Sequence, residues 1–221
     1  MSDEDVSALP ETDEPLWATR SWLHAETLES LAEVNEQCLE LLCEQAAVTR
    51  TTPAMLAELR PLWSALDVSA RRRIARCPCL LLDAGFVAGS RWAAVHDRRV
   101  HDRQRPPAGV AFFTVPGTVS VMRLVLTYAW FLARTQSVAA RLLLGMSGQC
   151  ARLIGACTLR EVTLLAESQP QWLKPRWPER SSVWRELLTI ASSGEPQALE
   201  RLRMRGVQLL AGEVRSLRDA D

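Results

Sequence analysis

The sequence lacks the features of fibrous, membrane-spanning and low-complexity chains. Its 221 residues include only 10 Gly and 12 Pro, too few for a collagen-like or low-complexity protein. No uninterrupted apolar run reaches the roughly 18–20 residues that cross a bilayer, and the nearest stretch, residues 119–133, is short and contains Arg123. An apolar content of 48% with 24% charged residues is typical of a soluble globular protein. The acidic first 15 residues resemble neither a signal nor a transit peptide, so we expect a cytoplasmic protein without a membrane segment.

Sequence motifs of catalysis and cofactor binding are also missing. There is no G-x-G-x-x-G, no G-x-x-x-x-G-K-[ST] and no C-x-x-C, and no acid partner stands out for the three histidines. Ser147 lies in Gly145-Met146-Ser147-Gly148, which does not have the G-x-S-x-G spacing of a nucleophile elbow, so we interpret it as a helix N-cap. The six cysteines fall mostly in apolar helical patterns and are expected to be buried thiols. We therefore predict that the chain is not an enzyme and has no cofactor, metal site or small-molecule substrate.

The charge is distributed unevenly along a chain whose formal net charge is zero. Residues 1–59 carry 13 Asp and Glu against two Arg, whereas residues 60–105 carry 10 Arg against four Asp. Nearly all the basic residues are arginines, and Lys174 is the single lysine. The guanidinium of arginine can form two hydrogen bonds at once to a phosphate or a carboxylate, so this excess is consistent with binding such groups. A GC-rich coding sequence is the alternative explanation for the excess. The candidate nucleic-acid or partner contacts are Arg71, Arg72 and Arg76 in one short helix and Arg98, Arg99, Arg103 and Arg105 in a loop. The alternatives are a solvated helix face and a solvent-exposed loop, and the sequence pI of 6.8 disfavours unaided DNA binding.

The hydrophobic pattern predicts a mainly α-helical fold with at most two or three short strands. Apolar residues between Thr27 and Ala46 recur at steps of three and four, with Glu on the other side. Caps, Pro and Gly delimit the remaining elements. We expect further helices over residues 54–66, 70–76, 78–84, 118–144, 148–156, 159–167, 183–191 and 196–217, an extended segment over 86–95 and a strand over 110–115.

An approximate internal repeat divides the chain into two helix-turn-helix-like halves. At a spacing of 80 residues, Ile74 and Cys77 coincide with Ile154 and Cys157, and each copy follows an amphipathic helix. Chance similarity between short helices is the alternative. The predicted organisation is a disordered acidic N-terminus (1–14), a first helical half (15–95), a linker with an Arg-rich loop and a short strand (96–117), and a second helical half (118–221). Such halves would pack together as a monomeric pseudo-dimer, with a homodimer as the other option.

Aromatic and arginine residues gather near the end of the second half. Trp172, Arg176 and Trp177 lie in a Pro-rich connector, and surfaces rich in Trp and Arg are favoured sites of protein binding. The alternative is that these side chains pack the connector onto the terminal helix. We take the three residues as candidate partner contacts.

The second half resembles the flagellar master transcriptional regulator subunit FlhD family. The similarity is carried by a helix–turn–helix stretch and an extended piece ending in Arg-aromatic: Leu144-Gly145-Met146-Ser147, Ala151, Ile154, Thr158-Leu159, Val162, Leu165-Ala166-Glu167 and Leu173-Lys174-Pro175-Arg176-Trp177. The resemblance implies an α-helical fold and assembly with a partner subunit on promoter DNA. This chain departs from the family in its length, its acidic head and its tandem copy.

The function that we expect is therefore non-catalytic. We predict a bacterial regulatory protein that acts by protein–protein binding, as a transcriptional regulator subunit resembling FlhD, with DNA contacted through a partner subunit. The alternative is a helical adaptor of a secretion or motility apparatus that binds no DNA.

Overall fold

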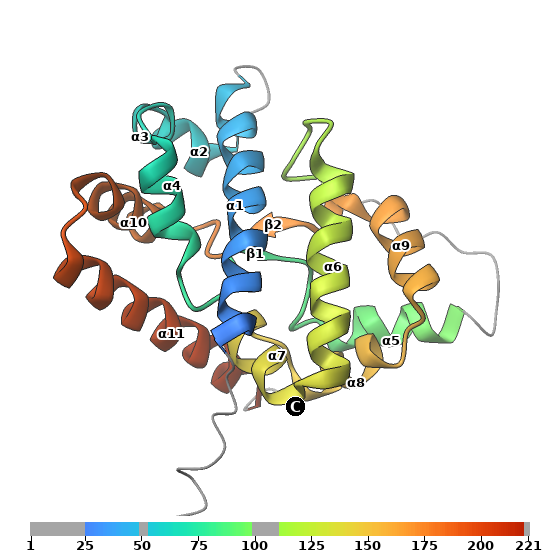
Figure 1. Cartoon of the computed structure of the whole chain (residues 1–221). Coiled ribbons are helices and arrows are strands. Elements are labelled where there is room, and N and C mark those ends of the chain that lie inside the picture. The colour runs from blue at the N-terminus through green and yellow to red at the C-terminus, as the bar shows by residue number, and fades with distance from the viewer. Residues whose placement is uncertain (1–24, 49–52, 99–110, 219–221) are drawn as a thin grey trace, which may run out of the picture.

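A computed structural model describes residues 25–48, 53–98 and 111–218 of the chain. Within these ranges it contains eleven α-helices, one short 3₁₀ helix and one two-stranded sheet, which confirms a mainly helical fold (Figure 1). No helix in the described part combines the length and the apolar character that a membrane crossing requires. The N-terminal segment 1–14 lies outside the described residues.

Two long helices, α1 (Ala25–Ala47) and α6 (Thr118–Thr135), lie side by side in the middle of the molecule (Figure 1). They run antiparallel, because the start of α1 meets the end of α6. The Tyr128 hydroxyl donates to the Thr27 carbonyl at 2.9 Å, and the Thr27 hydroxyl lies 3.2 Å from Gln136 Oε1. At the other end, Gln45 accepts from the Thr114 backbone N–H at 2.7 Å. Both helices bury one apolar stripe and leave the opposite side in solvent.

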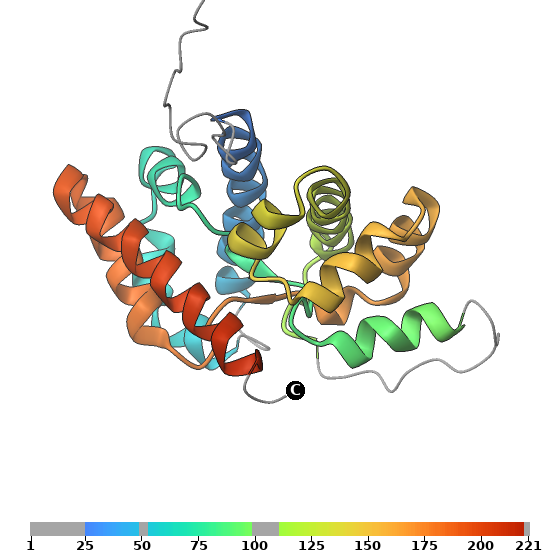
Figure 2. The ribbon, with the colours of Figure 1, turned by 90° about the horizontal axis from the view of Figure 1, so that it is seen from below.

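The remaining helices flank this pair on two sides (Figure 2). On the α1 side lie α2 (Ala54–Glu58), α3 (Arg60–Ser64) and α4 (Val68–Ala75), and α10 (Ser181–Ser193) packs on α3 and α4. On the α6 side lie α7 (Ser137–Leu144), α8 (Gly148–Gly155), α9 (Leu159–Ser168) and the 3₁₀ turn η1 (Pro170–Trp172), and α5 (Gly89–Arg98) packs on α8. The last helix, α11 (Pro196–Arg218), lies against α10 and α7.

A sheet of two strands, each two residues long, joins the two groups of flanking helices at the centre of the molecule. Strand β1 (Leu82–Asp83) pairs antiparallel with β2 (Lys174–Pro175), with Leu82 opposite Pro175 and Asp83 opposite Lys174. Backbone bonds extend this contact, from Arg176 N–H to the Leu81 carbonyl and from Leu80 N–H to the Leu143 carbonyl. One continuous core of buried apolar side chains surrounds the junction.

Local capping chemistry explains where the best-predicted helices begin and end. Ser147 accepts from the Cys150 N–H at 3.1 Å, and Thr158 and Glu161 form a reciprocal capping box at the start of α9. Gly145 ends α7 at φ 60°, a left-handed conformation that glycine adopts without a steric cost. These three features confirm the predicted breaks around α8 and α9.

Several expected elements are wrong. Residues 86–95, expected to be extended, belong largely to α5, which also takes in His96–Arg98 of the expected loop; residues 78–84 form turns and β1 instead of a helix; and residues 111–115 form no strand. The expected helix 118–144 is interrupted at Gln136, whose φ of −144° and ψ of 65° separate α6 from α7. The expected helix 70–76 begins earlier, at Val68 of α4, because Asp67 is its N-cap and accepts from the Ala70 N–H at 2.6 Å and from the Ser69 hydroxyl at 2.8 Å.

Candidate functional site

The arginines predicted on the short helix α4 point to three different surroundings. Arg72 and Arg76 are exposed, four residues apart on one face, whereas Arg71 is half-buried beside Cys43. Arg73 turns the other way and donates from Nε to the Ala191 carbonyl at 2.7 Å, at the end of α10. Successive helical residues rotate by about 100°, so three consecutive side chains cannot share a face. Only Arg72 and Arg76 therefore present a basic surface.

The predicted loop arginines fall almost entirely outside the part of the chain that the structure describes. Arg99, Arg103 and Arg105 lie outside the described residues, and Arg98 is the last residue of α5, with its side chain outside the described part. Helices α4 and α5 stand on opposite sides of the α1–α6 pair (Figure 2). The backbone of Arg98 is thus far from Arg72 and Arg76.

The aromatic and arginine cluster of the connector is buried, which corrects its assignment as a binding surface. Trp172, Arg176 and Trp177 are only 7%, 3% and 6% exposed. Trp172 packs edge-on against Trp92 with ring centroids 5.6 Å apart, and the Arg91 guanidinium lies 5.1 Å from the Trp172 ring. Sequence composition indicated residues that make strong contacts, but those contacts are made within the chain.

Arg176 lies at the centre of a buried hydrogen-bond network. Its Nε donates to the Leu80 carbonyl at 2.7 Å, its Nη2 donates to the Leu144 carbonyl, and its own carbonyl accepts from Trp184 Nε1 at 2.8 Å. The planar guanidinium suits this role because its N–H groups point in set directions toward several acceptors. A lysine would offer neither this geometry nor the same reach.

Asn35 and Asp83 complete the network from the first part of the chain. Asn35 is fully buried; its Nδ2 donates to the carbonyls of Ala75 and Cys79 at 3.0 Å each, and its Oδ1 accepts from the Leu81 N–H at 3.0 Å. Asp83 accepts from the Phe86 N–H at 3.0 Å, and its other oxygen lies 3.8 Å from Lys174 Nζ. We call Asn35, Asp83 and Arg176 the central polar cluster. Its polar groups hold backbone segments together and do not converge on an open cavity.

Three of the six thiols, those of Cys38, Cys43 and Cys150, have raised pKa values, which makes them poor nucleophiles. Burial raises the pKa of Cys38 far above its ordinary value, raises that of Cys150 to about 11, and raises that of the half-buried Cys43. At neutral pH these side chains are therefore protonated. Across the described ranges, no group of three His, Cys, Asp or Glu side chains is placed to hold a metal ion.

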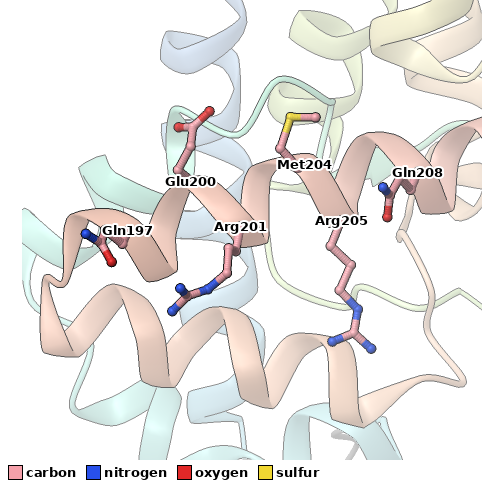
Figure 3. Close-up of a pocket in the computed structure, with 6 residues that line it drawn as sticks. All are labelled: Gln197, Glu200, Arg201, Met204, Arg205 and Gln208. Carbon is pink, nitrogen blue, oxygen red and sulfur yellow. The ribbon is translucent and has the colours of Figure 1, made fainter.

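Two hollows among the described residues do not gather catalytic groups. One is a void of about 10 Å³ lined by Cys77, Cys79, Trp177, Leu187 and neighbouring residues, which is room for one water at most. Another is an open surface hollow along the outer side of α11 (Figure 3). Its lining comes from this single helix: Gln197, Glu200, Arg201, Met204, Arg205 and Gln208. The arginines there engage carboxylates of the chain itself, Glu195 and Glu186.

Exposed large apolar side chains are concentrated in the second part of the chain, a feature that the sequence interpretation missed. Of the eight large apolar side chains exposed among the described residues, six lie on three helices of the second part: Leu124, Phe131, Val138, Leu142, Leu159 and Leu164. The signal available in the sequence was the seven-residue spacing of Leu124 and Phe131, which puts both on one side of α6. Because α6 is apolar on much of its circumference, the sequence alone does not tell whether Leu124 and Phe131 face the core or the solvent.

Comparisons of the chain with protein-family models, with curated proteins and with solved structures find no match. The description of its function therefore depends on the sequence and on the geometry above.

Proposed function

We propose that this chain is a non-catalytic regulatory protein that acts by binding a protein partner. The observation that carries the proposal is the concentration of exposed large apolar side chains on α6, α7 and α9. Contiguous exposed apolar surface is favoured at sites of protein association, and Leu124 and Phe131 share one side of α6. The buried polar groups support the same proposal, because Asn35 and Arg176 make structural bonds to backbone groups.

A role in transcription regulation, within the cytoplasm and connected with flagellar genes, is the form of this proposal that the FlhD resemblance favours. Helices α8 and α9 are joined by a tight turn that ends in the Thr158 cap, as in helix-turn-helix proteins. The exposed pair Arg72 and Arg76 supplies at most a few phosphate contacts. A partner subunit would therefore provide most of the DNA contacts.

A helical adaptor without DNA binding is the second candidate function. The observation in its favour is the outer side of α1, whose charged residues are all Glu. A row of carboxylates repels the phosphate backbone of DNA.

A gel-shift experiment over a salt series separates the two candidates. The purified chain, alone and with a co-purified partner, is mixed with flagellar promoter DNA at several NaCl concentrations. Regulation predicts a shift with the partner that weakens steeply with salt, and the slope of log K against log salt becomes shallower by about one to two in the double variant Arg72→Ala, Arg76→Ala. Arg201→Ala on α11 is the matched control. No shift at low salt, with the partner complex intact, favours the adaptor.

We further propose that the chain consists of two related halves that pair within one molecule. The turn between α3 and α4 and the turn between α8 and α9 have the same length and the same hydrogen bonds, displaced by 91 residues. In the first turn, the N–H groups of Ala65, Leu66 and Ala70 donate to Pro61 O, Trp63 O and Asp67 Oδ1, respectively. In the second turn, the N–H groups of Ala156, Cys157 and Glu161 donate to Arg152 O, Ile154 O and Thr158 Oγ1, in the same order. The starts of α1 and α6 are 93 residues apart, and the paired strands are 92 apart. The offset along the chain between the two proposed copies is thus 91 to 93 residues, whereas the sequence comparison suggested 80.

Under this proposal the halves exchange the helices that follow their strands, which are α5 after β1 and α10 after β2. Helix α10 packs on α3 and α4 of the first half, with Trp184 and Trp63 ring centroids 5.5 Å apart and Arg185 paired with Glu58 at 2.6 Å. Helix α5 packs on α8 of the second half. Exchange of an identical element between two subunits is a low-cost route to a dimer. In this chain the two exchanging subunits would be fused into one polypeptide.

A further inference from the structure

The outer sides of α1 and α6 form one elongated surface, because the two helices are adjacent along their length. Hydrogen bonds hold both ends: the Tyr128 hydroxyl to the Thr27 carbonyl at one end, and the Thr114 N–H to Gln45 at the other. Figure 1 shows the two helices running beside each other, and Figure 2 shows them at the same edge of the molecule.

The α1 part of this surface carries negative charge only. Five glutamates are exposed at steps of three, four and seven residues, and the helix contains no Lys or Arg: Glu26, Glu29, Glu33, Glu40 and Glu44. From Glu26 to Glu44 the row spans about 27 Å of helix. Glu36, half-buried, lies on the same side.

The α6 part is apolar on the side nearest α1. Leu124 is 37% exposed and Phe131 is 50% exposed, and both lie one turn from Tyr128, which reaches α1. The basic residues of α6 turn away toward α9. Arg123 pairs with Glu167 at 2.8 Å, and the Arg134 guanidinium lies 5.1 Å from the Trp130 ring, whose Nε1 donates to the Cys157 carbonyl.

We infer that this α1–α6 face docks a basic amphipathic helix of a partner protein. Apolar side chains of that helix, seven residues apart, would cover Leu124 and Phe131, while its Lys and Arg would lie along the glutamates of α1. The inference rests on the proposed function and names the chemistry of the partner. A helix suits the surface because both rows are straight and parallel to the helix axes.

Charge argues against the other occupants. A second copy seated on the same face by two-fold symmetry would place the glutamates of α1 either against a second row of glutamates or against Leu124 and Phe131, and neither arrangement pairs their charge. DNA and anionic lipid surfaces are repelled by the same row. A basic partner helix is the occupant whose charge complements α1 while its apolar side covers α6.

The test uses the full-length chain and a synthetic 18-residue peptide with a Lys/Arg face and Leu at two positions seven apart. Binding is measured by titration calorimetry, and the site is located by amide hydrogen exchange. We expect one peptide per chain with protection on α1 and α6. A peptide of the same composition with scrambled Leu positions should bind at least about tenfold more weakly.

Paired variants separate the contributions of the two rows. Leu124→Ser with Phe131→Ser, and Glu33→Gln with Glu40→Gln, should each weaken binding by about tenfold or more. Val68→Ser and Glu195→Gln, exposed elsewhere, are the controls and should leave binding unchanged. All variants must retain the wild-type melting temperature.

Three results would overturn the inference: binding that the variants do not weaken, protection outside α1 and α6, or preferential binding to phosphatidylglycerol vesicles. Each of these leaves the proposed function standing if the chain still assembles with its partner in the gel-shift experiment. Failure of that assembly with intact peptide binding would count against the proposed function alone.

Discussion

Replacing Asn35 should destabilise the fold strongly, because one side chain holds three separate backbone groups in the core. The amide donates to the carbonyls of Ala75 and Cys79 and accepts from the Leu81 N–H, each at 3.0 Å, and no part of it is exposed. These bonds join α1 to the segment that leads into β1. Water cannot reach the groups that the substitution would leave behind.

The size of the effect follows from the cost of unsatisfied buried groups. Each such group costs about 1–3 kcal/mol, so one N–H and two carbonyls give about 3–9 kcal/mol for Asn35→Leu, of which about 4 kcal/mol is a conservative value. That is a large part of the 5–15 kcal/mol that typically stabilises a domain, and it lowers the melting temperature by about 8–16 °C in a chain of this length. Leucine has the same branched arrangement of four side-chain heavy atoms as asparagine but a larger volume, so no cavity forms and crowding adds to the cost of the lost bonds.

Chemical denaturation followed by circular dichroism measures this change. Asn35→Leu and Asn35→Ala should both unfold at much lower denaturant concentration, the first through lost hydrogen bonds and crowding and the second through lost hydrogen bonds and a cavity. The exposed neighbour Gln37→Ala is the control and should stay within about 0.5 kcal/mol of wild type. If Asn35→Leu is as stable as wild type while Asn35→Ala is not, packing and not hydrogen bonding accounts for the role of Asn35.

The substitution Asn35→Asp should make the stability of the fold depend on pH. A buried carboxyl has a raised pKa and, when protonated, can donate to one carbonyl as the amide does. A folded-state pKa above the unfolded value means that stability is greatest at low pH and is lost as pH rises. The difference between Asn35→Asp and wild type should therefore shrink as pH falls toward about 4. A difference that is constant with pH would contradict the burial of this site.

Three further predictions follow from the core and from the exposed side of α4. Unfolded thiols ionise near pH 9, whereas the Cys150 thiol of the folded state stays protonated up to about pH 11. The free energy of unfolding should therefore fall as pH rises between these two values. Denaturant melts at a series of pH values measure this fall, and a constant stability over that range would contradict the burial of Cys150. Trp184→Phe should cost about 1–3 kcal/mol through the lost bond to the Arg176 carbonyl, measured by the same melts, and a change below about 0.5 kcal/mol would show that this bond is dispensable. The double variant Arg72→Ala, Arg76→Ala should leave the melting temperature within about 2 °C, because both side chains are exposed; a larger drop would reveal structural contacts.

Local signals in the sequence predicted the parts of the fold that local chemistry determines. The α1 stripe, the Ser147 and Thr158 caps and the Gly145 break all depend on residues within one or two turns of each other. The pairing of Leu82–Asp83 with Lys174–Pro175 joins residues that are far apart in the chain, and no local pattern specifies it.

The candidate site was predicted less well, because composition does not say which way a side chain faces. The pattern of Trp and Arg in the connector has the chemistry of a binding surface, and the same chemistry serves a core in which Arg176 finds three carbonyl and N–H partners. Arg72 and Arg73 are neighbours in sequence, yet one is exposed and the other caps α10. Only the packing of α10 on α4 distinguishes them.

Cleavage of the folded chain between the two halves is the most direct test of the proposed internal pairing. A specific protease site is inserted between residues 104 and 105, the folded protein is cut, and the product is examined by size-exclusion chromatography with light scattering. We expect both pieces to elute together with the mass of the intact chain and to separate only in denaturant, because α5 and α10 each pack on the other half. Pieces that separate under native conditions, with each retaining its own cooperative melt, would show that the halves are independent domains.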